Sequence, residues 1–258
     1  MSVGLALMMA SAIAPQWRLV WKDEFTPPGA PSPKNWTYET GYIRNNEAQF
    51  YTENRRENAR VEGGRLIIEA RKDNFKGNEV TSASITTQGK HSMLYGRVVV
   101  RAKIPTGRGT WPAIWMLGTN ITSVGWPRCG EIDIMENVGH NPEDMVFTIH
   151  RAKTESETGD VHKFEGKSIQ VKEPWKQFHD YELQWFPDRL DQLMDGKLVH
   201  TYRRDPQAGP EQWPFDKPQY LILNLAIGGS WGGQKGIDDA IFPARLEIDY
   251  VRVYEQIS

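Results

Sequence analysis

The sequence predicts an all-β protein, a sandwich of two antiparallel sheets with one sheet curved into a groove. Short runs of alternating apolar and polar residues recur along the chain, and turn residues separate them, with 23 Gly and 16 Pro among 258 residues. Long helical patterns rich in Ala, Leu, Glu and Lys are missing. All-β folds of this length are routinely single domains, so we expect one domain over residues 16–258.

The expected strands can be placed in chain order. Residues 17–25 alternate and predict the first strand. A hairpin is predicted next, because Gly63-Gly64 is a strong turn signal between two alternating runs. Residues 220–227 are nearly all apolar, which predicts a strand buried on both faces, and residues 228–233 predict a flexible loop. The remaining strands are predicted at residues 58–62, 65–71, 81–87, 97–104, 107–117, 131–136, 145–150, 181–185, 190–194, 197–202 and 246–254.

Three acids within six positions mark the stretch Glu131-Ile-Asp-Ile-Met-Glu136. In a regular strand Glu131 and Asp133 share one face and Glu136 lies on the other. One extra residue at Met135 would form a β-bulge and bring all three acids to the same face. The alternative is a solvated acidic strand face. The apolar, Gly-punctuated surroundings favour a functional site.

A bulged strand of this kind would allow a particular reaction. If Glu131 and Glu136 lean toward each other, their carboxyl groups approach to about 5 Å, the separation of a retaining glycosidase. In that mechanism one carboxylate attacks the sugar and the other protonates the leaving oxygen. A wider separation would indicate inversion instead. The spacing therefore favours glycoside hydrolysis as a hypothesis.

Aromatic residues precede the acidic strand and polar residues accompany them. Trp111 and Trp115 alternate onto one strand face, where they could stack on sugar rings or pack in a core. His150 falls on one side of the next strand, and a structural role is the alternative to a place over the cleft. Residues 41–51 combine Asn, Glu and Gln with aromatics, which predicts either a turn or a rim that binds sugar hydroxyls.

Charge, cysteine count and the N-terminal segment indicate the expected partners, disulfides and location of the protein. A formal net charge of -2 gives no indication of a nucleic-acid partner. Cys129 is the single cysteine, which excludes an internal disulfide framework. Residues 1–15 form an apolar segment with an Ala12-x-Ala14 pattern, typical of a secretory signal, so we expect a secreted or periplasmic protein. The run is shorter than the ~18 residues of a membrane span, so we expect no membrane insertion.

Several motifs stand in order along the chain: Trp-Lys-Asp-Glu-Phe at residues 21–25 and those at residues 45–51, 111–118, 125–136, 224–229 and 249–254. Through these motifs the chain resembles bacterial laminarinases, the endo-β-1,3-glucanases of glycoside hydrolase family 16. The resemblance covers residues 17–254. It implies a β-jelly-roll fold with a concave substrate cleft, and hydrolysis of β-1,3-glucan with retention by a monomer that needs no catalytic cofactor.

The resemblance also implies a role for individual residues. Glu131 would be the nucleophile, Glu136 the acid/base, and Asp133 a hydrogen-bonded assistant between them. A structural Ca²⁺ would be held by oxygen atoms of three residues, and hard oxygen ligands suit this ion. The implied metal ligands are Glu24, the Gly64 carbonyl and Asp249. The implied glucose-binding residues are Asn45, Arg101, Trp111, Trp115, Trp126 and His150.

Two departures from the family pattern stand out, and alternative functions stay open. Val99 replaces a Glu that relatives often carry, which predicts one lost polar contact in the cleft. Residues 190–194 replace a more aromatic strand. Rival functions are hydrolysis of mixed-linkage glucan (lichenan), agar or carrageenan, or binding of β-glucan without catalysis. Binding modules generally lose the acids, and the extra residue Met135 argues against the transglycosylase branch.

Overall fold

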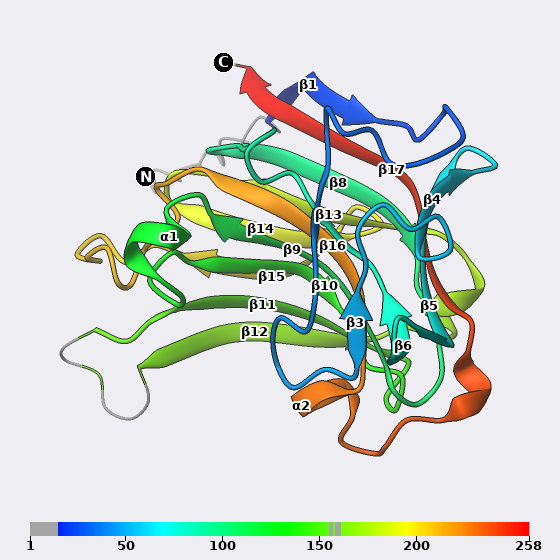
Figure 1. Cartoon of the computed structure of the whole chain (residues 1–258). Coiled ribbons are helices and arrows are strands. Elements are labelled where there is room, and N and C mark those ends of the chain that lie inside the picture. The colour runs from blue at the N-terminus through cyan, green and yellow to red at the C-terminus, as the bar shows by residue number, and fades with distance from the viewer. Residues whose placement is uncertain (1–14, 155–156, 158–160, 258) are drawn as a thin grey trace, which may run out of the picture.

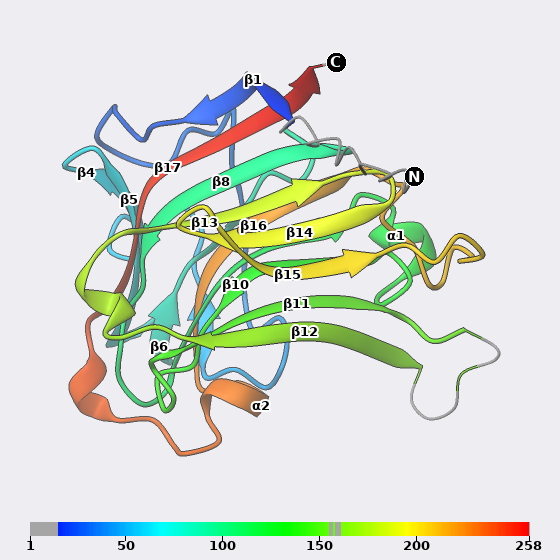
Figure 2. The same ribbon diagram turned by 180° about the vertical axis from the view of Figure 1, so that it is seen from behind.

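Alternating side chains give each strand one apolar face, and two sheets bury these faces against each other. The computed structural model describes residues 15–154, 157 and 161–257. The expected apolar segment 1–15 therefore lies, apart from Pro15, outside the described residues. Figures 1 and 2 show the two curved sheets stacked as a sandwich, with β1 running beside β17 along one border.

The larger sheet contains ten strands in the described part of the chain. Its main path runs β15 (Lys197–Arg203), β14 (Arg189–Met194), β13 (His179–Trp185), β8 (Gly96–Lys103), β17 (Ala244–Ile257), β5 (Arg65–Phe75), β6 (Asn78–Ser82) and β3 (Gln49–Tyr51). Two further strands, β1 (Gln16–Asp23) and β4 (Ala59–Glu62), pair with β17 and β5. All its pairs are antiparallel except β3 with β6, which is parallel.

The smaller sheet has seven described strands, all paired antiparallel. Their order is β12 (His162–Gln170), β11 (Asp144–Ala152), β10 (Glu131–Glu136), β9 (Thr110–Gly118), β16 (Gln219–Ile227), β7 (Ser84–Thr86) and β2 (Thr37–Glu39). Short helical turns lie between strands at α1 (Ile121–Val124), η1 (Pro174–Lys176), α2 (Gly229–Gly232) and η2 (Asp239–Ile241). Among the residues that the structure describes, no helix is long and apolar enough to span a membrane.

The two-sheet sandwich is confirmed, with several local differences from the prediction, among them the short unpredicted strands β2 and β3. The single strand expected at residues 81–87 is two strands, because the chain leaves the larger sheet after Ser82 and enters the smaller one at Ser84. The loop predicted at residues 228–233 contains the helical turn α2. The sequence did not predict β12, because this edge strand is mostly exposed and carries few apolar residues.

One large hydrophobic core fills the space between the sheets. It contains the inward-facing residues of β8, such as Val98 and Val100. Three of the ten tryptophans, Trp36, Trp185 and Trp213, are fully buried in it. Packing against this core fixes the smaller sheet, whose other face is free to form a groove.

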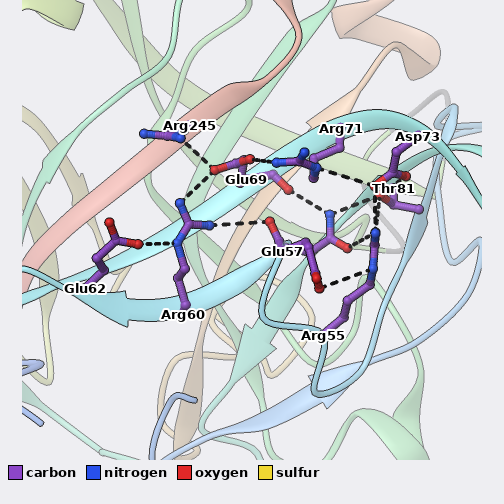
Figure 3. A network of polar contacts seen from close by, with 10 residues as sticks. Arg55, Glu57, Arg60, Glu62, Glu69, Arg71, Asp73, Thr81 and Arg245 are labelled. Carbon is purple, nitrogen blue, oxygen red and sulfur yellow. Dashed lines mark hydrogen bonds and ion pairs between the residues drawn. The ribbon is translucent and has the colours of Figure 1, made fainter. Parts of the chain in front are cut away.

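An ion-pair network covers part of the larger sheet around the buried carboxylate of Glu69 (Figure 3). Arg60 and Arg245 donate to this carboxylate at 2.9 and 2.8 Å, and Arg71 also contacts it. Burial alone would raise the pKa of Glu69, but the hydrogen bond from Arg60 and the surrounding positive charges lower it below its ordinary value. The folded state therefore favours the ionised carboxylate.

We expect Glu69→Gln to lower the free energy of unfolding at pH 7 by about 1–3 kcal/mol, because charged hydrogen bonds are lost in a buried position. Because the pKa is lowered on folding, this contribution is present above the unfolded-state pKa of about 4.3 and is lost as the pH falls through the folded value. Urea unfolding at neutral and acidic pH measures both effects. Glu62→Gln is the matched control, because Glu62 also contacts Arg60 but is exposed. Equal losses in both variants would contradict the prediction.

Candidate active site

Strand β10 is bulged where the sequence predicted it. Its pairing with β11 changes register between Asp133 and Glu136, and its pairing with β9 changes between Asp133 and Met135. Ile134 and Met135 are consecutive residues, yet both are fully buried in the main core. One extra residue therefore resets the alternation. As a result Glu131, Asp133 and Glu136 all line the same groove.

The groove has a volume of about 780 Å³ and lies on the face of the smaller sheet that points away from the core. Alternate residues of β9 form its floor, which confirms the predicted platform: Trp111, Ala113, Trp115 and Leu117. Alternate residues of β11 continue it, again as predicted: Val146, Thr148 and His150. Its lining residues come from both edge strands, β12 and β2, and from β11, β10, β9 and β16 between them, so the groove crosses the sheet from edge to edge.

Each of the three acids has a different partner in the groove. Trp126 Nε1 donates to Glu131 Oε2 at 2.7 Å, and Trp111 Nε1 donates to Glu136 Oε1 at 2.9 Å. His150 Nε2 lies 2.8 Å from Asp133 Oδ2 and 3.9 Å from Glu131 Oε1. These contacts hold the carboxyl groups in fixed positions and give each a distinct environment.

Burial and mutual repulsion raise the pKa of all three carboxyl groups. Burial and the charge of Asp133 raise the pKa of Glu131 to about 8, against the opposing effect of His150. Burial raises the pKa of Glu136 to about 7, although the Trp111 hydrogen bond opposes it. The pKa of Asp133 lies well above its ordinary value because of burial and the charge of Glu136. A proton held by Asp133 removes its repulsion of Glu131, which favours the ionised form of Glu131.

This arrangement suits two-step displacement at a sugar carbon. An ionised Glu131 can act as a nucleophile, while a protonated Glu136 can act as an acid near neutral pH because its pKa is raised. Neighbouring Trp111, Trp115 and Trp126 offer flat apolar faces on which pyranose rings stack. The groove thus combines reactive carboxyl groups with a surface typical of carbohydrate binding.

We expect Trp111→Phe to move the basic limb of the pH profile of kcat/KM to higher pH. The indole N–H stabilises the ionised form of Glu136, so its removal raises the pKa of that group and keeps the acid protonated longer. Trp115→Phe is the matched control, because its N–H bonds Asn224 Oδ1 at 2.7 Å and no acid. A basic limb that stays in place or moves to lower pH would contradict the prediction.

The comparison with protein families decides to which family the chain belongs. Residues 46–252 match the glycosyl hydrolases family 16. This match covers most of the chain and includes the whole acidic strand. The chain belongs to family 16 of the glycosyl hydrolases.

Relatives within family 16 are similar over nearly the full chain. The beta-glucanase of Rhodothermus marinus is 47% identical over 253 residues, which cover 95% of this chain and 87% of the relative. The crystal structure of the laminarinase from the same organism has a TM-score of 0.87 at 45% identity and covers 95% of this chain and 100% of its own. Another similar structure is a mutant of SCLam, a non-specific endo-β-1,3(4)-glucanase, co-crystallised with 1,3-β-D-cellotriosyl-glucose. It has a TM-score of 0.86 at 45% identity and covers 95% of this chain and 96% of its own.

Most of the sugar-binding residues expected from the family 16 resemblance lie in the groove. Asn45, Trp111, Trp115, Trp126 and His150 all line it, and their contacts with glucose stay predictions. Asn45 adopts a left-handed conformation with φ 56°, which Asn tolerates better than most residues. Its side chain donates to the buried Glu47 at 3.2 Å, so a hydrogen bond anchors this rim loop.

Arg101 is a correction to the predicted site. It lies on β8 in the larger sheet, where Val100 and Ala102 face the core and Arg101 faces outward. Its guanidinium lies 3.3 Å from Asp180 and 3.4 Å from Asp249, away from the groove. Val99 occupies the same outward face and is also not among the groove-lining residues. The expected loss of a polar contact in the cleft at Val99 is therefore wrong.

Several groove residues were not predicted from the sequence, among them Arg44, His162 and Phe164. The guanidinium of Arg44 lies 4.8 Å from the Trp115 ring centroid and pairs with Glu39 at 2.5 Å. His162 and Phe164 come from the unpredicted strand β12, and the His162 ring lies 4.5 Å from that of Trp126. The alternation of His162 and Phe164 among polar residues was the available signal, and it is weak without the neighbouring strand.

The carboxylates expected to bind calcium lie outside the groove. Asp249 lies on β17 between the residues that pair with β1 and those that pair with β5. Glu24 directly follows β1 and Gly64 directly precedes β5, so the strand pairing brings all three residues to the same gap. Separately, ligand atoms of Glu131, Asp133 and His150 lie within 4.8 Å of one another, and these residues belong to the acidic site described above.

Proposed function

We propose that the protein is a retaining endo-β-1,3-glucanase that hydrolyses laminarin-type glucans. The bulge of β10 carries this proposal, because it turns Glu131, Asp133 and Glu136 into one aromatic groove. The family 16 relatives that are laminarinases or β-glucanases support the choice of glucan. A groove that crosses the full width of the sheet suits binding within a long polymer rather than at its end.

The proposed reaction proceeds in two steps with balanced proton transfer. Glu131 attacks the anomeric carbon while the proton of Glu136 passes to the leaving glycosidic oxygen, which gives a glycosyl ester. The ionised Glu136 then removes a proton from water, the water oxygen attacks the same carbon, and Glu131 leaves as a carboxylate. Asp133, whose Oδ2 lies 2.8 Å from His150 Nε2, carries a proton beside the nucleophile. Two inversions at one carbon give net retention.

A product assay tests both the activity and the substrate. Purified protein is incubated with laminarin, lichenan and agarose, and reducing ends are followed over time while NMR records the first anomer released. We expect β-anomers and short oligosaccharides from laminarin, with any activity on lichenan measuring tolerance of mixed linkages. Reducing ends from agarose alone would overturn the glucan assignment. Binding to laminarin without reducing ends would indicate a glucan-binding module instead.

We also propose a structural Ca²⁺ bound by Glu24, the Gly64 carbonyl and Asp249. The hydrogen bond and charge of Arg252 lower the pKa of Glu24, so its carboxylate is the ionised form that the metal needs. Arg252 donates to both Glu24 oxygens at 2.9 and 3.0 Å, and this contact would have to rearrange. The calcium would supply positive charge that ties the ends of β1 and β5 to β17.

Thermal unfolding measures this metal site without reference to activity. After EDTA treatment and dialysis, added Ca²⁺ is expected to raise Tm by several degrees, because a ligand that binds only the folded state stabilises it. Mg²⁺ controls for ionic strength, and Asp249→Asn should remove the response to Ca²⁺. An unchanged Tm of the wild type after calcium addition would contradict the prediction.

The location and assembly of the protein are further proposals. We infer export, which the apolar N-terminal segment and the polymeric nature of the proposed substrate support. Fractionation of producing cells with N-terminal sequencing of the product tests it. Action as a monomer and away from membranes stays an expectation, which light scattering and flotation with vesicles would check.

A further inference from the structure

A buried glutamine contacts the catalytic strand from the opposite side of the sandwich. Gln192 lies on β14 in the larger sheet and is completely inaccessible to solvent. Its Nε2 donates to the backbone oxygen of Asp133 at 2.6 Å and lies 3.5 Å from the backbone oxygen of Thr148. The side chain thus crosses the core and reaches the backbone behind the three acids.

The contact is made at the residue where the bulge begins. Pairing of β10 with both neighbours shifts register directly after Asp133 and resumes at Met135 with β9 and at Glu136 with β11, so the bulge itself lacks regular strand partners. A strong hydrogen bond to the Asp133 carbonyl supplies a fixed point from the core side. The path from there to Glu136 determines where that carboxyl group stands relative to Glu131.

The amide of Gln192 is itself held in one orientation. His200 Nδ1 lies 2.8 Å from Gln192 Oε1, so the ring donates to the amide oxygen and leaves Nε2 to face Asp133. His200 is also buried, and its Nε2 lies 3.5 Å from Glu165 Oε1 on β12. The pairing of β14 with β15 changes register between Gln192 and Leu193. Gln192 and His200, which pair across these strands, therefore lie next to a second irregularity.

The neighbours of Gln192 on its face of β14 are apolar, so an apolar residue would be expected at this position. Leu190 and Met194, two positions away on the same face of β14, belong to the main hydrophobic core. Burying an amide there costs free energy unless its donors and acceptors are paired. A glutamine is suited to this position because both ends of its amide are paired. Its Nε2 donates to the backbone of the catalytic strand, and its Oε1 accepts from His200.

We propose that Gln192 is a positioning residue, which fixes the bulge of β10 and thereby the placement of Glu136 relative to Glu131. It touches neither substrate nor reacting atoms and acts through the backbone of Asp133. The proposal rests on the retaining hydrolase function proposed above. It adds a residue of the opposite sheet to the machinery of the reaction.

The variant Gln192→Met keeps the side-chain length and removes all hydrogen bonds of the amide. We expect kcat on laminarin to fall about 10- to 100-fold, because a displacement of about 1 Å in a reacting group has an effect of this size. KM should stay within about two-fold, since Trp111 and Trp115 on β9 still form the floor. A stability defect alone would leave kcat of the folded protein unchanged.

The leaving group of an aryl laminaribioside distinguishes positioning of the acid from general damage. A dinitrophenyl group departs without protonation, whereas a methylphenyl group needs the proton of Glu136. In Gln192→Met, kcat/KM should fall at least ten-fold for the methylphenyl substrate and at most about two-fold for the dinitrophenyl substrate. Equal losses on both substrates would overturn the proposal, as would kcat within two-fold of the wild type.

Matched variants complete the experiment. Leu190→Ala removes core packing on the same strand without touching Asp133, and is expected to lower Tm while the ratio between the two substrates stays that of the wild type. His200→Phe leaves Gln192 in place but frees its amide, so it should show the Gln192→Met pattern at smaller amplitude. It serves as the test if Gln192→Met does not fold. If the wild type were inactive on laminarin and on both aryl substrates, the proposed function itself would be refuted. If instead the wild type were active and Gln192→Met kept wild-type kinetics, only the role of Gln192 would be refuted.

Discussion

Glu131→Ala is expected to lower kcat on laminarin by roughly 10⁴-fold or more, because no carboxylate remains to attack the anomeric carbon. The fold should persist, and the variant should be at least as stable at neutral pH. Burial raises the pKa of Glu131 to about 8, so ionising this group costs the folded state stability, and the cost grows as the pH rises above the unfolded value of about 4.3 toward about 8. Laminarin assays and thermal unfolding at neutral pH measure both effects.

Azide reports the role of Glu131 directly. With the carboxylate gone, azide can enter from the same side and attack an aryl laminaribioside, which gives the α-glycosyl azide. Product stereochemistry by NMR is the measurement. Glu79→Gln is the control, since this exposed acid pairs with Lys72 and is not a groove-lining residue, and it should keep wild-type rates. Near-normal hydrolysis by Glu131→Ala, or formation of the β-azide, would show that Glu131 is not the nucleophile.

Glu136→Ala is expected to show the complementary pattern. Hydrolysis of laminarin should fall about 10²- to 10⁴-fold, the contribution typical of a general acid and base. With a dinitrophenyl laminaribioside the first step should still proceed, because this leaving group needs no proton. The glycosyl ester at Glu131 should then accumulate, and a burst of dinitrophenol followed by slow turnover is the measurement.

The second half of the reaction gives the decisive observation for Glu136. Azide needs no base, so it should attack the accumulated ester and release the β-glycosyl azide with a strong increase in rate. The comparison between the two alanine variants is the control, because they should yield azides of opposite configuration. If azide does not accelerate turnover by Glu136→Ala, another residue supplies the acid and base.

Local patterns in the sequence were sufficient to predict the bulged acidic strand. Two apolar residues flank Asp133, and the spacing to Glu136 is wrong for a regular strand, so a bulge was the arrangement that could unite the acids. The floor residues Trp111 and Trp115 followed from the same alternation. These features depend on neighbours a few positions apart, which a sequence displays directly.

Features that depend on contacts between distant strands could not be predicted in this way. Alternation shows that Arg101 shares a face with Val99, but it does not show that β8 belongs to the larger sheet and turns that face away from the groove. Gln192 lies in a short apolar run, and its bond to Asp133 joins residues 59 positions apart. Strand β12 carries His162 and Phe164 into the groove from an edge position that few apolar residues mark.

Both carboxyl groups that are proposed to react come from one six-residue strand, so the bulge of that strand, and not the surrounding loops, sets the distance between their backbone positions. The rim consists of other segments, among them the loop that carries Arg44 and Asn45 and the turn that carries Trp231. Rim segments can therefore be exchanged for those of relatives with different substrates while the reaction centre stays intact. Chimeric enzymes of this kind would inherit their glycan preference from the transplanted rim and their stereochemistry from the host.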